Sequence, residues 1–182
     1  MIQYICRDMA QALRYLPYGL ATGIPVAVIV LLVVNTRRKR MGKTPLKWLP
    51  GILFGIYFAV LMAITFLSRE SGSRSGAMDL ELFSTWGIND RNNAYVIENV
   101  LLFIPYGFLC GWNFIGARNL FRCAALGAVT SFGIEWMQRM TGRGYFQIDD
   151  ILTNILGTVI GWIIFRILWS QGESMESRNL SP

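Results

Sequence analysis

Long apolar stretches alternate with short polar segments along the whole chain. Most of these stretches approach the ~20 residues that an α-helix needs to cross the hydrocarbon core of a bilayer. The pattern predicts about five transmembrane helices, over Leu16–Val34, Trp48–Leu67, Ala94–Gly116, Cys123–Met137 and Asp149–Trp169. Only helices and closed barrels satisfy their backbone groups inside lipid. The expected fold class is therefore an all-α integral membrane protein, built as a transmembrane bundle over residues 16–169.

The two ends of the chain differ from this central bundle. Residues 1–15 combine apolar side chains at helical spacing with three charges, a pattern typical of a segment that lies in the membrane interface. Residues 170–182 are polar and are expected to form a disordered C-terminal tail. The sequence thus predicts an interfacial N-terminal segment, a bundle and a tail.

One long polar connection, residues 68–93, separates the second and third predicted helices. Its first half is rich in serine and glycine and is expected to be flexible. Its second half contains MDLELF, which predicts a short surface helix over Met78–Trp86. In such a helix the apolar side chains would touch lipid or the bundle, namely Leu80, Leu82, Phe83 and Trp86.

The distribution of basic residues predicts how the bundle is oriented. Six of the 17 Lys and Arg residues fall between Arg37 and Lys47, where there is no acidic residue. Such an excess is typical of a cytoplasmic loop, which places the N-terminus outside and the C-terminus inside. We therefore attribute the formal charge of +6 to anchoring at the membrane surface, and we expect no binding of nucleic acid.

Charged and amide side chains gather near three helix ends that this topology brings to the outer leaflet. Ser131, Glu135 and Gln138 share one helix face, and Asp150 and Asn154 share a face of the next helix, so the two polar faces are expected to meet. Ionisable groups at this depth should face the interior and pair. The sequence predicts an outer polar site made of Glu98, Asn99, Glu135, Gln138, Arg139, Arg143, Asp149, Asp150 and Asn154.

Individual members of this set have simpler interpretations. Asp149 and Asp150 start a helix, where the helix dipole favours a carboxylate without any ligand. Glu135 lies at the disfavoured end of its helix, so we expect it to pair with Arg143 or Arg139.

A different group of residues is assigned to helix packing, because small residues let helices approach closely and proline kinks them: Pro105, Gly107, Gly157 and Gly161.

Several kinds of chemistry are excluded by composition. The chain has no histidine, which rules out Ser-His-Asp and Cys-His nucleophiles and imidazole-bound zinc within it. Its three cysteines show no CxxC spacing and are interpreted as packing thiols. We expect no metal site and no cofactor.

Two motifs in the apolar part of the chain carry a family resemblance. The run ENVLLFIPYGF, from Glu98 to Phe108, is followed by GIEWMQ and by TGRGYFQIDDILTNILG. In this order they resemble the signatures of the VanZ-like family of bacterial membrane proteins, over roughly Trp48 to Trp169. The resemblance implies a multi-pass protein of the bacterial cytoplasmic membrane. The family's namesake is associated with resistance to teicoplanin, a glycopeptide with a fatty acyl tail, and the resemblance implies no particular reaction.

Three classes of function follow from these observations. The first is a non-enzymatic factor that acts in glycopeptide or lipoglycopeptide resistance, whose outward polar site engages membrane lipids, a lipid-linked cell-wall precursor or a lipoglycopeptide. The second is a small membrane enzyme that uses carboxylates as acid and base, or as metal ligands, on a lipid head group. The third is a transporter or channel, which is disfavoured because no internal repeat is evident. We favour the first class.

Overall fold

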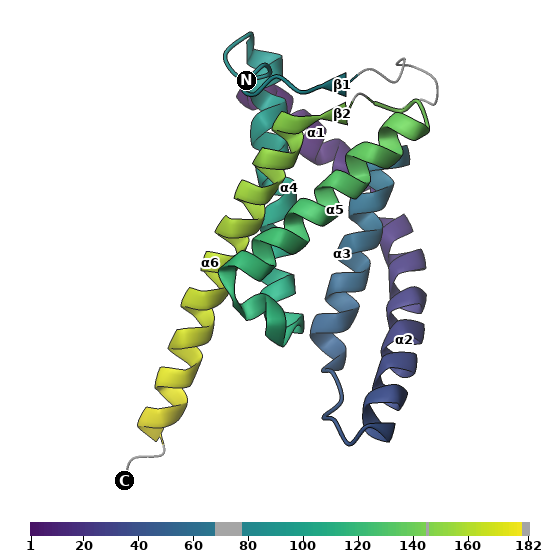
Figure 1. The fold of residues 1–182 in the computed structure, drawn as a ribbon, viewed down its shortest axis with the longest axis vertical. Coiled ribbons are helices and arrows are strands. Elements are labelled where there is room, and N and C mark those ends of the chain that lie inside the picture. The colour runs from purple at the N-terminus through teal and green to yellow at the C-terminus, as the bar shows by residue number, and fades with distance from the viewer. Residues whose placement is uncertain (68–77, 145, 180–182) are drawn as a thin grey trace.

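The computed structural model describes residues 1–67, 78–144 and 146–179, and this part of the chain is almost entirely helical (Figure 1). The elements in chain order are α1 (Ile2–Ala12), the 3₁₀ turn η1 (Leu13–Tyr15), α2 (Leu16–Arg40), α3 (Trp48–Leu67), β1 (Met78–Asp79), α4 (Asp90–Asn113), the 3₁₀ turn η2 (Ile115–Arg118), α5 (Leu120–Met140), β2 (Phe146–Gln147) and α6 (Ile148–Asn179). The prediction of an all-α membrane bundle is confirmed.

Four helices within the described residues are long and apolar enough to cross a membrane: Ile2–Arg40, Trp48–Phe66, Asp90–Asn113 and Ile148–Gln171. The predicted helix that is missing from these four, Cys123–Met137, corresponds to α5, which crosses the bundle obliquely (Figure 1). It is not among the four because Arg122, Glu135 and Arg139 interrupt its apolar sequence. Of these three charges only Glu135 is buried, and neighbouring segments cover it.

Helix ends differ from the predictions where asparagine side chains cap them. α4 begins four residues earlier than predicted, because the Asn89 side chain accepts a hydrogen bond from the backbone N–H of Asn92 at 2.9 Å. α5 begins early for the same reason, since Asn119 accepts from the N–H of Arg122 at 3.1 Å. Such caps satisfy donors that a helix leaves unpaired in its first turn. At the other end of the chain, α6 continues to Asn179, into the segment predicted as a tail.

The predicted surface helix over Met78–Trp86 is wrong. β1 instead pairs in parallel with β2, Met78 opposite Phe146. The Asp79 carboxylate then accepts a hydrogen bond from the backbone N–H of Glu81 at 3.1 Å and from the Ser84 hydroxyl at 2.8 Å. Side chains that bind nearby backbone groups in this way compete with helix formation.

The chain folds so that many connections meet at one end, which we call the upper end. α1, β1, β2, the start of α4, the end of α5 and the start of α6 all lie there, while the α2–α3 connection lies at the opposite end (Figure 1). α1 runs across the upper end at an angle to α2 and packs against α4. Its placement in the membrane interface, and the orientation with the upper end outside, remain predictions.

The closest packing joins α4 to α6. A methyl group on Gly107 would overlap the backbone carbonyl of Thr158, and one on Gly161 would overlap that of Ile104. Gly157 lies equally close to the carbonyl of Val100. Small residues allow this approach in membranes, where packing, not hydrophobicity, holds helices together. Pro105, grouped with these glycines by sequence, is exposed and faces elsewhere.

A glycine substitution tests this contact. Gly161→Ala places a methyl group against a backbone carbonyl that cannot move alone, so we expect a loss of about 1–3 kcal/mol of stability, the usual effect of overpacking. Gly133 on α5 has open space around its Cα, so Gly133→Ala is the matched control and should not destabilise. Thermal unfolding in detergent measures both variants. Equal melting temperatures for the two would show that the α4–α6 contact is loose.

Candidate functional site

Asp149, at the start of α6, binds the backbone of a loop that is distant in sequence. Asp149 is buried, and its carboxylate accepts hydrogen bonds from the backbone N–H groups of Phe83 at 2.7 Å and Thr85 at 3.0 Å. It thus joins the start of α6 to the segment before α4. Neither the cap interpretation nor the ligand interpretation of Asp149 foresaw this partner, because sequence periodicity does not report pairing between segments so far apart.

Residues at the end of α5 hold other backbone groups. The Glu135 carboxylate accepts from the N–H of Gln147 at 3.0 Å, and the Gln138 amide donates to the Thr65 carbonyl at 3.1 Å. The Arg143 guanidinium donates to the carbonyl of Phe66. Glu135 and Gln138 are almost fully buried, with 3% and 1% of their surface exposed.

The expected ion pair between Glu135 and Arg143 does not form. The ion pairs found among the described residues join other groups, and these two side chains bind separate backbone segments. Arg143 binds the end of α3 because the last carbonyls of a helix have no hydrogen-bond donor within that helix. Lipid cannot supply such a donor, whereas a guanidinium group can.

The two polar helix faces meet where the sequence predicted. The Asn154 amide on α6 donates to the Ser131 hydroxyl on α5 at 2.8 Å, and both residues are buried. The Asn154 Oδ1 atom is also buried and has no hydrogen-bond partner among the described residues. The remaining predicted residues here are only half-buried: Arg139, which lies over the Trp136 ring, Asp150 beside Asp149, and Asn99 on α4.

Glu98 belongs to a different group of side chains, between α1 and α4. Arg91 on α4 pairs with Asp8 on α1 at 2.7 Å and lies over the rings of Tyr95 and Tyr4. Glu98 lies within electrostatic reach of Asp8 and Arg91, and its buried Oε1 atom has no hydrogen-bond partner among the described residues. We call Asp8, Arg91 and Glu98 the α1–α4 charge cluster.

Sequence reasoning missed two members of this cluster. The sequence pattern predicts Asp8 only as one charge of an interfacial segment and Arg91 only as part of a polar connection. The available signal was the spacing of Arg91 and Glu98, which are seven residues apart and therefore share a helix face once the helix is extended to Asp90.

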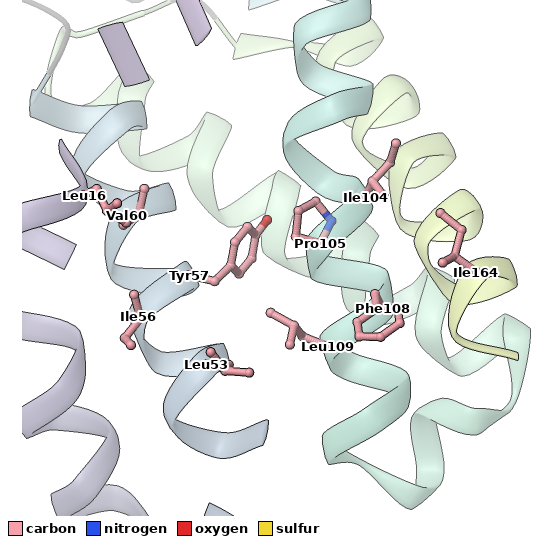
Figure 2. A pocket seen from close by; sticks show the side chains of 10 residues that line it. All are labelled: Leu16, Leu53, Ile56, Tyr57, Val60, Ile104, Pro105, Phe108, Leu109 and Ile164. Carbon is pink, nitrogen blue, oxygen red and sulfur yellow. The ribbon is translucent and has the colours of Figure 1, made fainter. Parts of the chain in front are cut away.

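An apolar pocket of about 510 Å³ lies between α3 and α4 (Figure 2). Its walls come from α2, α3, α4 and α6, and include Leu16, Leu53, Tyr57, Pro105, Leu109 and Ile164. Tyr57 contributes a polar atom, but its hydroxyl donates to the Leu102 carbonyl at 2.7 Å. Arg91, Glu98 and Pro105 follow each other at intervals of seven residues on α4. The charge cluster and the pocket therefore lie along one face of the same helix.

No three His, Cys, Asp or Glu side chains within the described ranges are grouped so that they could hold a metal ion. Among the cysteines, Cys110 and Cys123 are buried and Cys6 is exposed, all as free thiols. Several of the polar side chains described above bind one another or the backbone, whereas the Oε1 atom of Glu98 and the Oδ1 atom of Asn154 have no hydrogen-bond partner among the described residues.

Comparison with known proteins identifies the family. A model of the VanZ/LLP1 family matches residues 54–169, which is more than half of the chain. The chain belongs to the VanZ/LLP1 family. No curated protein and no solved structure matches it. The matched region contains Glu98, the polar faces of α5 and α6, and most of the pocket residues. Helices α1 and α2 lie before this region. The protein is therefore a VanZ-type membrane protein.

Double-mutant cycles test the pairing at the upper end. Glu135→Gln and Arg143→Gln act on separate backbone partners, so their effects on stability should add within about 0.5 kcal/mol. Ser131→Ala and Asn154→Ala remove the same hydrogen bond, so that cycle should show a coupling of about 0.5–1.5 kcal/mol. Thermal stability in detergent is the measurement. Strong coupling of Glu135 with Arg143 would mean that they do form a pair.

Proposed function

We propose that this VanZ-type protein binds a lipid-linked or acylated molecule, with the apolar chain in the α3–α4 pocket and the head near the α1–α4 charge cluster. The observation that carries the proposal is the pocket itself. Its volume of about 510 Å³ lies within the range of small-molecule sites. Charged groups follow at the upper end of the same face of α4, which matches the two halves of an amphiphile.

The division between chain and head has an energetic consequence. An acyl chain gains about 0.8 kcal/mol per CH₂ when it leaves water, but a chain that comes from the bilayer has already left water. Ordinary lipid tails therefore compete for the pocket almost equally. Selectivity has to come from the head group, where Asp8 and Arg91 offer both charges at a half-buried position. This is why the charge cluster belongs to the proposed site.

The polar residues at the end of α5 and the start of α6 support the site indirectly. Glu135, Gln138, Arg143 and Asp149 are engaged with the backbone of other segments, so they fix the upper end of the bundle. This engagement favours a binding factor over an enzyme that would use the same carboxylates as acid, base or metal ligands.

The biological role that we propose follows the family. The protein would act in the bacterial cytoplasmic membrane with the upper end outside, contribute to glycopeptide or lipoglycopeptide resistance, and take as partner a lipid-linked cell-wall precursor or a lipoglycopeptide. Basic residues between Arg37 and Lys47 support this orientation, because they lie at the opposite end of the bundle.

Expression in a susceptible Gram-positive host tests the role. Tolerance should rise more for teicoplanin than for vancomycin, because the acylated drug partitions into the leaflet that contains the site. Minimum inhibitory concentrations of both drugs, with empty vector as control, are the measurement. Equal shifts would indicate an effect on the shared cell-wall target and would contradict the proposal.

Filling the pocket tests the binding site directly. Leu53 on α3 lines the pocket, and Leu49, one turn away, is 62% exposed and does not. Leu53→Trp should reduce crosslinking of a diazirine-bearing palmitoyl probe to α3 and α4 several-fold, and Leu49→Trp should leave it unchanged. Peptide mapping after photolysis in nanodiscs gives the readout. Similar labelling of both variants would show that the pocket takes no chain.

A further inference from the structure

The segment that joins β1 to α4, Leu80–Ile88, exposes many apolar side chains, and we call it the upper loop. Five of them are each more than half exposed: Leu80, Leu82, Phe83, Trp86 and Ile88. The loop contains Glu81 but no lysine or arginine. Large apolar side chains gathered on one connecting loop indicate a surface that contacts something else.

The upper loop is held firmly from inside the protein. Asp149 accepts hydrogen bonds from the N–H groups of Phe83 and Thr85, and Asn93 accepts one from the N–H of Gly87 at 2.7 Å. Asp79 binds the hydroxyl of Ser84. Two of these bonds join the loop backbone to one buried carboxylate, and the other two lie nearer the surface; together they limit how far the loop can move. The exposed side chains are therefore kept outward by the fold.

The backbone at Phe83 is strained. Its φ is 63°, in the left-handed region, and it is the one non-glycine residue with positive φ within the described residues. A bulky side chain is unfavourable there. Such strain persists where the surroundings impose it, and it concentrates at functional sites. Here the backbone conformation of Phe83 is held by the two hydrogen bonds that the N–H groups of Phe83 and Thr85 donate to Asp149. The Phe83 side chain is 73% exposed as a result.

We propose that the upper loop docks into the interfacial layer of the lipid bilayer, and that Asp149 is the residue that positions it. The loop leads directly into α4, one of the helices able to cross the membrane, so it lies where that helix leaves the hydrocarbon core. Aromatic side chains such as Trp86 are enriched at that depth. Because the loop has no basic residue, its attraction comes from apolar contact and not from anionic lipid.

This role goes beyond the proposed binding of an amphiphile. It assigns Asp149, which the sequence placed in a polar ligand site, to membrane docking through the backbone of Phe83 and Thr85. Asn at position 149 keeps the size of the side chain but replaces one acceptor oxygen with a donor NH₂ group. One of the two backbone bonds is then lost, and the loop is no longer held outward.

Fluorescence in bilayers tests the docking. In the full-length Cys6→Ser chain, single cysteines replace Phe83, Glu81 or Leu49 and carry an environment-sensitive NBD label, since Cys110 and Cys123 are buried. The protein is reconstituted in phosphatidylcholine nanodiscs with or without nitroxide lipids. We expect blue-shifted emission at position 83 that is quenched most by nitroxides near the head groups, with weaker quenching at position 81. Position 49 reports lipid contact on a helix and serves as a positive control.

The Asp149→Asn variant then tests the positioning role. Quenching at position 83 should fall at least two-fold, while quenching at position 49 stays unchanged and shows that the bundle is folded. Raising the salt concentration should not change the signal. Water-like emission at position 83 without quenching would overturn the proposal. So would blue-shifted emission that no lipid nitroxide quenches, because a second copy or a protein partner would then cover the loop.

Discussion

The glycine contacts between α4 and α6 are the constraint on which the rest of the structure depends. Because Gly107, Gly157 and Gly161 each face a backbone carbonyl of the other helix, the two helices can meet in one register only. That register fixes the height at which α6 begins, and with it the position of Asp149. The loop before α4 can then be joined to α6 by one carboxylate, and the α1–α4 cluster is left on another side of α4.

Lipid also determines what the polar side chains do. A backbone carbonyl or N–H that faces hydrocarbon without a partner is costly, and each helix end and each irregular connection leaves several of them. At the upper end these groups are bound by Glu135, Gln138, Arg143 and Asp149. A concentration of ionisable residues in an apolar chain is usually taken as a sign of a ligand site. In this protein three of the six predicted ionisable residues, Glu135, Arg143 and Asp149, bind irregular backbone at the end of α3, before α4 and before α6.

The parts of the fold that follow from local pattern could be predicted. Apolar runs of membrane length gave α3 with its true bounds, and helical spacing placed Ser131 opposite Asn154. What failed depends on contacts between distant segments. β1 and β2 are two residues each, too short to show any period. The partner of Arg143 is the backbone carbonyl of Phe66. Every residue has such a carbonyl, so the sequence does not indicate which one a guanidinium group will bind.

The separation of the polar groups into two sets changes how the candidate site should be understood. Glu98 shares its helix face with Arg91 and with the pocket residue Pro105, whereas Gly107 and Gly111 on the same helix face α6. One helix thus serves as the rigid wall of the pocket and as the partner that holds α6 in register. Because interiors packed this closely adjust in steps and not continuously, a molecule that enters the pocket meets a fixed wall on α4. α1 contributes no residue to the pocket; it has no buried residue and is held to α4 by charges at the upper end of that face. The charge cluster therefore combines Asp8 of α1, which lies before the region that the family model covers, with Arg91 and Glu98 of α4, which lie inside that region.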